Sequence, residues 1–413
     1  MPAPIEAPHP GAARLSRNLG LTLLVCYGLG VTVGAGIYVL VGEAGTRAGI
    51  NAPVAFLISA TIMGFTAASF AELAVRHPVS AGEAAYVEAG LSSRWLGVAA
   101  GMLVVVAGMV STAAIARGAT GYLQVILPLP DTVWVATVVL AMGAVSAWGI
   151  REAVGFAAIM TVIEVGGLIV VIGAGLWHQP SLATELPSAF SGLGSFGPWP
   201  GVLGASMVAF FAFIGFEGVV NVVEEVRRPE RTVPLAIALT LVISTILYVL
   251  VVWVVQQSIP AQELSTSSAP LSLAFERLTG ASPLILALIG VFATINGVIA
   301  QTVMSSRVLY GLARRGALPA ILARVDTHTH TPLFATVTVV AVVLLLALTI
   351  PIESLADMTS RVMLFVFALV NASLVAIKLR GDAAPPRTNV PVLVPVIGTL
   401  SCLALLLVDL WLQ

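Results

Sequence analysis

The chain has 413 residues, of which 58% are hydrophobic and only 9% are charged. Soluble domains typically carry charge on about a quarter of their residues, so this composition excludes a water-soluble globule and indicates an integral membrane protein. The net charge of −1 gives no sign of nucleic-acid binding. The two cysteines, Cys26 and Cys402, lie in apolar runs and predict neither a disulfide nor a metal site.

Apolar runs of roughly 20 residues, the length that crosses a bilayer as a helix, predict eleven membrane spans. Residues 1–18 are interpreted as a disordered cytosolic tail, and the apolar run after them is too long for a signal peptide. A polar loop at His178–Pro198 separates five spans from five more, and one further span comes last. The predicted helices are Leu19–Thr46, Ala52–Val75, Trp95–Tyr122, Thr132–Gly149, Val154–Trp177, Gly201–Val226, Val233–Gln256, Pro283–Leu312, Pro332–Ile350, Ile352–Ile377 and Val392–Leu412.

This division predicts a ten-helix core over residues 19–377, built from one repeat at 19–177 and a second at 201–377. A linker and the eleventh helix occupy 378–413. Most of the 19 Lys and Arg residues fall in loops on one side of the predicted bundle. Because short cytosolic loops collect positive charge, the N-terminus is expected inside a cytoplasmic membrane and the C-terminus outside it.

Two glycine-broken segments lie in the middle of predicted spans, at Gly28–Ile37 and Phe210–Gly218. Glycine in a helix interior costs about 1 kcal/mol relative to alanine, so such clusters at membrane depth need a reason beyond helix formation. One interpretation is unwound backbone that contacts a substrate, since secondary transporters place a broken helix at the start of each of two repeats. The alternative is close packing of neighbouring helices through small residues.

Several motifs resemble those of the amino acid–polyamine–organocation permeases, in the order and spacing of that superfamily, over Leu19 to Pro332. Within it, the segment Gly34–Glu43 is most similar to the branch of cationic amino acid transporters. The matching segments are Gly28–Ile37, Ser69–Pro78, Ser80–Tyr86, Phe210–Glu217, Glu224–Pro229, Thr232–Pro234, Ser306–Tyr310 and Ala313–Pro319.

The resemblance implies the all-α membrane fold called LeuT-type. In it, helices 1–5 and 6–10 are related by a pseudo-two-fold axis in the membrane plane, helices 1 and 6 are broken, and one bundle rocks against a scaffold. The family usually has twelve helices, whereas about eleven are predicted here. The ten-helix core is therefore expected intact, and a dimer surface built from the last two helices is in doubt.

An α-amino acid presents a carboxylate and an ammonium group, and broken helices supply partial charges of both signs. The amides of Gly34, Ala35 and Gly36 begin the outer half of helix 1 and are placed to bind an anion. The resemblance implies that carbonyls freed in helix 6, at Phe211, Ala212 and Ile214, accept hydrogen bonds from the ammonium group, with the Thr32 carbonyl opposite. Ala35 replaces the Ser or Thr of other members, so recognition depends more on backbone. The predicted substrate-binding residues are Thr32, Val33, Gly34, Ala35, Gly36, Phe211, Ala212, Phe213, Ile214 and Gly215.

Glu217 comes directly after the break in helix 6. A carboxyl group within a span is expensive, so its side chain is expected to face the bundle interior or water. It is interpreted as a gate or a proton-sensitive partner of unwound backbone, or as a cap for the amides after Gly215; the two interpretations are compatible. It does not by itself establish a cationic substrate.

Glu164 lies ten residues into the fifth helix, about 15 Å deep at 1.5 Å per residue and so close to the midplane. Some family members have a lysine at this step, whose ammonium group stands in for a sodium ion. The reversed sign here predicts a group that binds a cation directly, with Ser305 and Ser306 as neighbours, or one that holds a proton, because burial favours the neutral acid. The hypothesis is proton coupling through Glu164, and the alternative is a neutral acid that only stiffens the helix packing.

The sequence therefore predicts a secondary active transporter of amino acids, with protons as the coupling ion and sodium as the alternative. An exchanger of amino acids or polyamines and a membrane sensor that binds without transporting remain open. An enzyme is not expected, because the chain has no His-Glu-x-x-His or Gly-x-Ser-x-Gly motif. Neither a cofactor nor a metal is expected, and the partners are a small amine-containing substrate and the lipid bilayer.

Overall fold

The computed structural model describes residues 19–412 except 79–81, 149–153, 330 and 382–387. Within these residues the chain forms helices and turns, and the only extended pairing is an isolated bridge between Leu19 and Val226. The predicted cytosolic tail and part of the linker before the last helix lie outside the described residues. An all-α architecture is thereby confirmed.

The spans occur in the predicted order, and the first and sixth are each broken in two. The first span consists of α1 (Leu21–Thr32) and α2 (Ala35–Ala48), and the sixth of α9 (Trp199–Phe213) and α10 (Gly218–Asn221). By length and composition, nine helical segments of the described chain can cross a membrane, and α1 and α15 are shorter apolar helices. The remaining spans are α3 (Ala52–Arg76), α5 (Arg94–Ile126), α6 (Asp131–Trp148), α7 (Val154–His178), α11 (Pro229–Ser258), α14 (Leu284–Arg314), α15 (Leu333–Thr349), α16 (Ile352–Arg380) and α17 (Leu393–Leu412).

Four shorter helices were not predicted: α4 (Gly82–Leu91), α8 (Leu182–Glu185), α12 (Ala261–Thr266) and α13 (Pro270–Thr279). A search for apolar runs of membrane length passes over helices of ten residues or fewer, particularly ones that carry charge. Local signals do mark some of them, since α13 starts with Pro270 and ends at Gly280 in the left-handed conformation. Of the four, α4 packs most extensively against the long spans, through α5 and α16.

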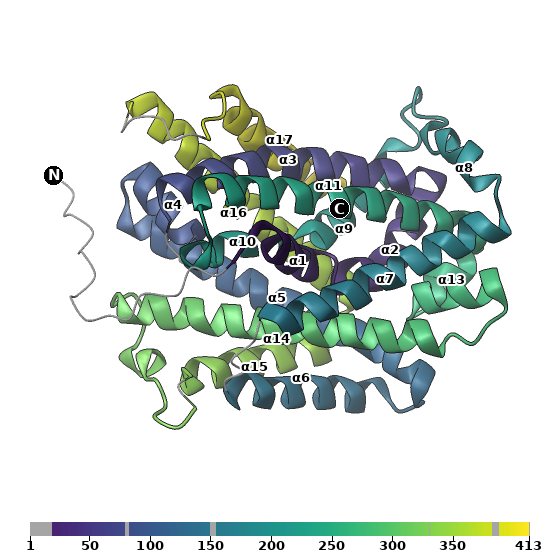
Figure 1. The fold of residues 1–413 in the computed structure, drawn as a ribbon, viewed down its shortest axis with the longest axis horizontal. Helices are drawn as coiled ribbons and strands as arrows, with labels where there is room; N and C mark the ends of the chain where they lie inside the picture. The colour runs from purple at the N-terminus through teal and green to yellow at the C-terminus, as the bar shows by residue number, and fades with distance from the viewer. Residues whose placement is uncertain (1–18, 79–81, 149–153, 330, 382–387, 413) are drawn as a thin grey trace.

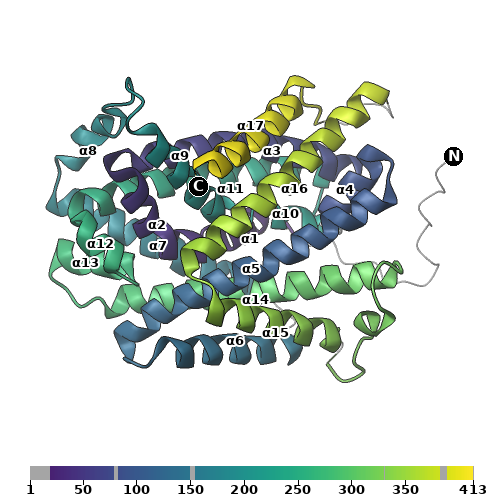
Figure 2. The same ribbon diagram turned by 180° about the vertical axis from the view of Figure 1, so that it is seen from behind.

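The long helices α5 and α14 lie against each other through the middle of the bundle (Figure 1). On one side they are covered by α6 and α15, while α3, α11, α16 and α17 lie on the other (Figures 1 and 2). The broken spans sit between these layers, where α1 contacts α7, α10 and α11. Both helix breaks are therefore held at the centre of the molecule.

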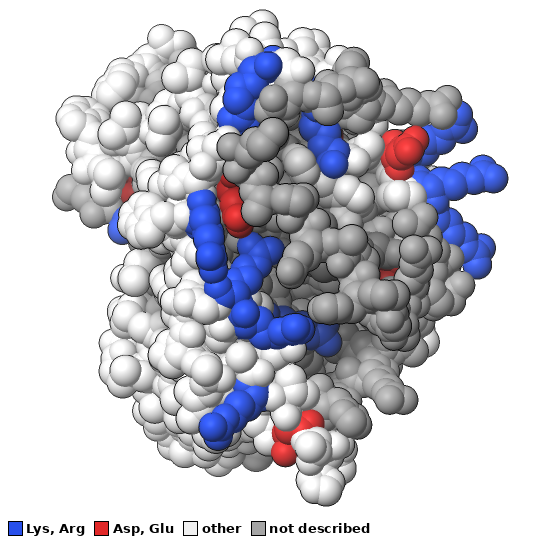
Figure 3. Space-filling view, turned by 90° about the vertical axis from the view of Figure 1, so that its left-hand side faces the viewer, with Lys and Arg blue, Asp and Glu red and all other residues white. Residues whose placement is uncertain are grey.

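Basic side chains gather at the end of the bundle that carries α4 (Figure 3). There Glu72, whose side chain is fully buried, pairs with Arg76 at 2.8 Å and with Lys378 of α16 at 2.8 Å. The second carboxylate oxygen also accepts the amide of Val390, which precedes α17, at 2.8 Å. One carboxylate thus joins α3, α16 and the approach to α17.

Replacing Glu72 with glutamine is expected to lower the free energy of unfolding by about 3 kcal/mol, because two nearly buried cations lose their counterion. Thermal unfolding of the purified protein in detergent measures the change. The matched control is Glu263→Gln, which breaks a largely exposed pair with Arg277 and is expected to cost less than about 1 kcal/mol. Equal, small effects of the two substitutions would contradict this role of Glu72.

Candidate functional site

The break in the first span is a two-residue interruption at Val33 and Gly34. The α1 helix ends at Thr32, and Gly34 adopts φ −51° and ψ −129°, outside the helical region, before α2 begins at Ala35. The amides predicted to bind an anion therefore do stand at the start of a helix. Gly36 faces the other broken span, since a Cβ there would come within 2.7 Å of the Cα of Ala212.

The break in the sixth span is centred on Gly215, whose φ of +134° is a conformation that other residues rarely adopt. A Cβ at this position would come within 2.6 Å of the carbonyl oxygen of Val31 in the first span. Glycine is required at both places because the two broken backbones touch. Close packing and broken helices, the two interpretations of the glycine clusters, therefore occur together.

Tyr248 of α11 joins the two breaks through its hydroxyl group. This hydroxyl lies 2.6 Å from the Thr32 carbonyl oxygen and 3.0 Å from that of Ala212. These are two of the carbonyls that were predicted to accept hydrogen bonds from a substrate ammonium group. A third, that of Phe211, accepts the amide of Ile214 at 3.1 Å. In this conformation, two of the predicted acceptors share the single hydroxyl proton of Tyr248, and the third accepts a backbone amide.

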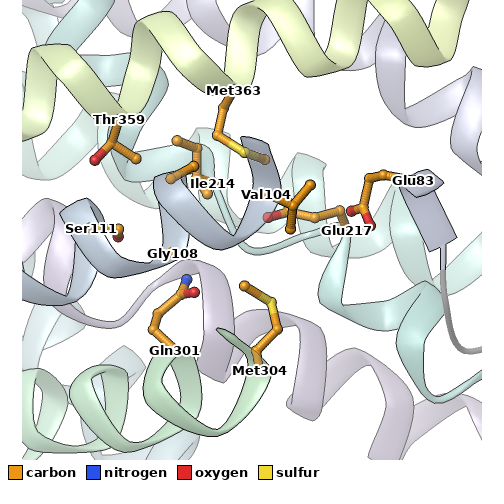
Figure 4. A pocket seen from close by; sticks show the side chains of 11 residues that line it. Glu83, Val104, Gly108, Ser111, Ile214, Glu217, Gln301, Met304, Thr359 and Met363 are labelled. Atoms are coloured by element: carbon orange, nitrogen blue, oxygen red, sulfur yellow. The ribbon is translucent and has the colours of Figure 1, made fainter. Parts of the chain in front are cut away.

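Glu217 caps the unwound backbone, since its Oε2 accepts the Gly215 amide at 2.8 Å. Its side chain is buried and lines a narrow cavity among α4, α5, α14 and α16, as Figure 4 shows. The cavity has room for about one water molecule, so a substrate would have to displace side chains to enter it. The lining residues are Glu83, Val104, Ala107, Gly108, Ser111, Ile214, Glu217, Gln301, Met304, Thr359 and Met363.

Of the predicted substrate-binding residues, only Ile214 lines this cavity, together with Glu217 from the coupling set. None of the described residues of α1 and α2 lines this cavity. Most of the lining was missed by sequence reasoning, including Glu83 and Gln301. Gln301 carried a usable signal, because a polar side chain within an apolar span is rarely placed there for packing alone.

Glu164 is fully buried on α7, as its depth in the span predicted. Its Oε1 accepts a hydrogen bond from the Asn296 amide of α14 at 3.2 Å, and its Oε2 has no hydrogen-bond partner among the described residues. The Tyr38 hydroxyl of α2 donates to the main-chain oxygen of Glu164 at 2.6 Å. The carboxyl group therefore bridges the fifth and eighth spans beside the broken first span, and one of its oxygens is left for a proton or a cation.

The expectation that Ser305 and Ser306 neighbour Glu164 is wrong. The α14 residue that contacts Glu164 is Asn296, and Ser305 lies about 13 Å further along the helix at 1.5 Å per residue. There it packs against Gly108 of α5, and its hydroxyl group is buried without a partner in the described part of the chain. The Ser306 hydroxyl donates to the Val303 carbonyl within its own helix at 2.9 Å. The serines thus belong to the neighbourhood of the cavity rather than to that of Glu164.

The aromatic residues of the sixth span pack in clusters. Phe213 packs against Tyr248 in a tilted arrangement with ring centroids 5.0 Å apart, and the ring centroids of Phe70 and Phe367 each lie 5.7 Å from that of Phe216. Phe210 also contacts Phe367, at 5.9 Å. All three phenylalanines are fully buried, so they fix the position of the break and do not line the cavity.

On the side opposite α4, one arginine links both broken spans to α16. Arg47 at the end of α2 forms a paired contact with Asp357 of α16, with both N–O distances 3.0 Å. It also contacts Glu43 at 2.7 Å and donates to the Gly204 carbonyl of α9 at 3.2 Å. Charge-assisted hydrogen bonds therefore hold this end of both broken spans against α16.

Comparison with known proteins identifies the class to which this fold and these breaks belong. The model of the amino acid permease family matches residues 19–412, and the chain belongs to that family. Its members are permeases rather than enzymes, and the LeuT-type arrangement of two five-helix repeats is the fold of this superfamily.

Individual relatives differ in their names. The chain is 31% identical to "Cationic amino acid transporter 2, vacuolar" of Arabidopsis thaliana over 88% of this chain and 60% of that protein. It is 32% identical to an uncharacterised transporter of Mycobacterium tuberculosis, over 95% of this chain and 86% of the relative. It is 26% identical to the branched-chain amino acid permease BcaP of Bacillus subtilis, over 96% and 89%. The chain thus spans about three fifths of the length of the plant relative.

Proposed function

We propose that the chain transports amino acids across the cytoplasmic membrane by alternating access. The observation that carries this proposal is the contact between the two helix breaks, in a chain of the amino acid permease family. At the breaks, the Gly34–Gly36 amides would bind the substrate carboxylate. The substrate ammonium group would replace the Tyr248 hydroxyl as the hydrogen-bond donor to the carbonyls of Thr32 and Ala212. The end that carries α4 faces the cytosol in this proposal, in keeping with its basic side chains.

Proton entry drives the transport through Glu164. The supporting observation is that this buried carboxyl group makes one neutral hydrogen bond, to Asn296, and has no ion pair within the described part of the chain. An uncompensated charge at this depth is costly, so the group is expected to hold a proton or a cation when the site is closed. Sodium is the alternative coupling ion, and it would need several further oxygen ligands around Glu164, because a bound metal ion is held by several oxygens.

Uptake of a labelled amino acid panel into proteoliposomes tests the proposal, with and without an inward proton gradient in sodium-free buffer. Accumulation of one substrate group that collapses with the gradient would support proton symport. Uptake only into vesicles preloaded with unlabelled amino acid would identify an exchanger and overturn the coupling. Binding without flux in either format would instead identify a sensor and overturn transport itself.

Tyr248→Phe is expected to slow the initial rate of uptake about tenfold and to reduce the free energy of unfolding by about 2 kcal/mol. The lost hydroxyl leaves the Thr32 and Ala212 carbonyls without a buried donor, and the breaks lose the group that joins them. Initial rates and thermal unfolding measure the two effects. Tyr310→Phe, where the hydroxyl accepts a long contact from Arg314 at 3.4 Å, is the control that should change neither.

A further inference from the structure

The cavity beside the sixth-span break is lined by two carboxyl groups from different elements. Glu217 comes directly after the break, and Glu83 comes from α4, outside the membrane spans. The two side chains are only 4% and 6% exposed, respectively. No Lys, Arg or His is among the described residues that line the cavity. Two neighbouring carboxylates cannot both stay charged in such surroundings without a positive group nearby.

A third polar group is also available to a ligand. Gln301 of α14 is 8% exposed, its side chain extends into the cavity in Figure 4, and its Oε1 has no hydrogen-bond partner among the described residues. A buried amide oxygen without a donor is unusual and costs about 1–3 kcal/mol. The cavity thus presents two carboxylates and an unused acceptor, a set that is complementary to a donor with positive charge.

The remaining walls indicate which kind of cation fits. They are largely apolar, and a bare metal ion would instead require six or more oxygen ligands. Two of the lining residues are methionines, and their flexible side chains can move aside when a methylene chain enters. The apolar lining residues are Val104, Ala107, Ile214, Met304 and Met363.

We propose that this cavity binds the positively charged end of the substrate side chain, an ammonium or guanidinium group, and that Glu83 sets this selectivity for charge. The inference rests on the proposed function, because the substrate backbone must be held at the adjacent helix breaks. Ile214 and Glu217 belong to both regions, so a side chain anchored at the break extends directly into the cavity. The charged end then meets Glu83 and Glu217, and its methylene groups lie against the methionines.

The inference is tested by measuring how tightly the purified full-length protein binds the two members of ligand pairs that differ in charge but little in shape. Arginine is compared with citrulline, and lysine with norleucine, in sodium-free buffer. The charged member of each pair is expected to bind at least about tenfold more tightly, as for a buried charge pair. Equal binding of arginine and citrulline to the unaltered protein would overturn the inference, as would stabilisation by sodium chloride alone that arginine does not increase.

Glu83→Gln is expected to reduce the preference for arginine over citrulline by at least about tenfold. The matched control is Glu88→Gln on the same helix, where the carboxylate pairs with Arg315 away from the cavity, and its preference should equal that of the unaltered protein. An unchanged preference in folded Glu83→Gln would contradict the role of this residue. Uptake of citrulline or norleucine without preference for charge would overturn only this inference, whereas no flux of any amino acid would overturn the proposed function.

Discussion

Glu164→Gln is expected to abolish accumulation of substrate driven by a proton gradient, while exchange of internal for external substrate continues. Glutamine can still bond to Asn296 and has nearly the same volume, but it cannot release a proton. The site would therefore behave as if permanently protonated. Uptake driven by the gradient should fall to the level of simple equilibration, and its rate should no longer change with external pH.

Two measurements make this result specific to Glu164. Glu276→Gln removes an exposed carboxyl group from α13 and should leave both the accumulation and its pH dependence intact. Counterflow, in which labelled substrate enters vesicles preloaded with unlabelled substrate, shows that the Glu164→Gln protein still cycles. Normal accumulation with an unaltered pH profile in the variant would exclude Glu164 as the coupling group and leave it a packing residue.

Gly215→Ala is expected to reduce transport at least a hundredfold and to destabilise the protein by about 4 kcal/mol. The estimate combines backbone strain of about 1–3 kcal/mol with overpacking of about 1–3 kcal/mol. Both effects come from the added Cβ. The backbone at position 215 has a φ of +134°, which side chains rarely adopt, and the Cβ would lie 2.6 Å from the Val31 carbonyl oxygen. Since that carbonyl belongs to the first span, relief of the contact would push the two breaks apart.

Gly173→Ala on α7 provides the comparison, because a Cβ there has no atom within 4 Å. It should leave transport unchanged and stabilise the helix slightly, by up to about 1 kcal/mol. Initial uptake rates and thermal unfolding of both variants decide the matter. Transport by Gly215→Ala at a rate close to that of Gly173→Ala would show that the contact between the breaks is dispensable.

The sequence predicted those parts of the fold that are encoded locally. Length and hydropathy specify the spans, and glycine clusters specify the breaks, because glycine inside a helix is costly unless the backbone needs it. The burial of Glu164 could be inferred by counting residues along one helix. Each of these inferences needs only neighbours in sequence.

The features that could not be predicted depend on how distant segments meet. Glu83 reaches the cavity because α4 folds back against α5 and α16, and no periodicity in the sequence encodes that contact. The partner of Glu164 was misassigned because α14 is 31 residues long, and which of its turns faces α7 depends on how the two helices cross. The Tyr248 hydroxyl likewise contacts carbonyls that are far away in the sequence: Thr32 is separated from it by 216 positions and Ala212 by 36.

The central claim is that transport at the paired breaks is coupled to protons through Glu164. Simultaneous recording of substrate entry and internal pH in proteoliposomes tests this claim most directly. With no proton gradient imposed and an inward substrate gradient, internal acidification should accompany uptake in a fixed ratio. The same recording with Glu164→Gln should show substrate movement without acidification. Substrate entry that never acidifies the vesicles containing the unaltered protein, or acidification that persists in the variant, would contradict coupling through Glu164.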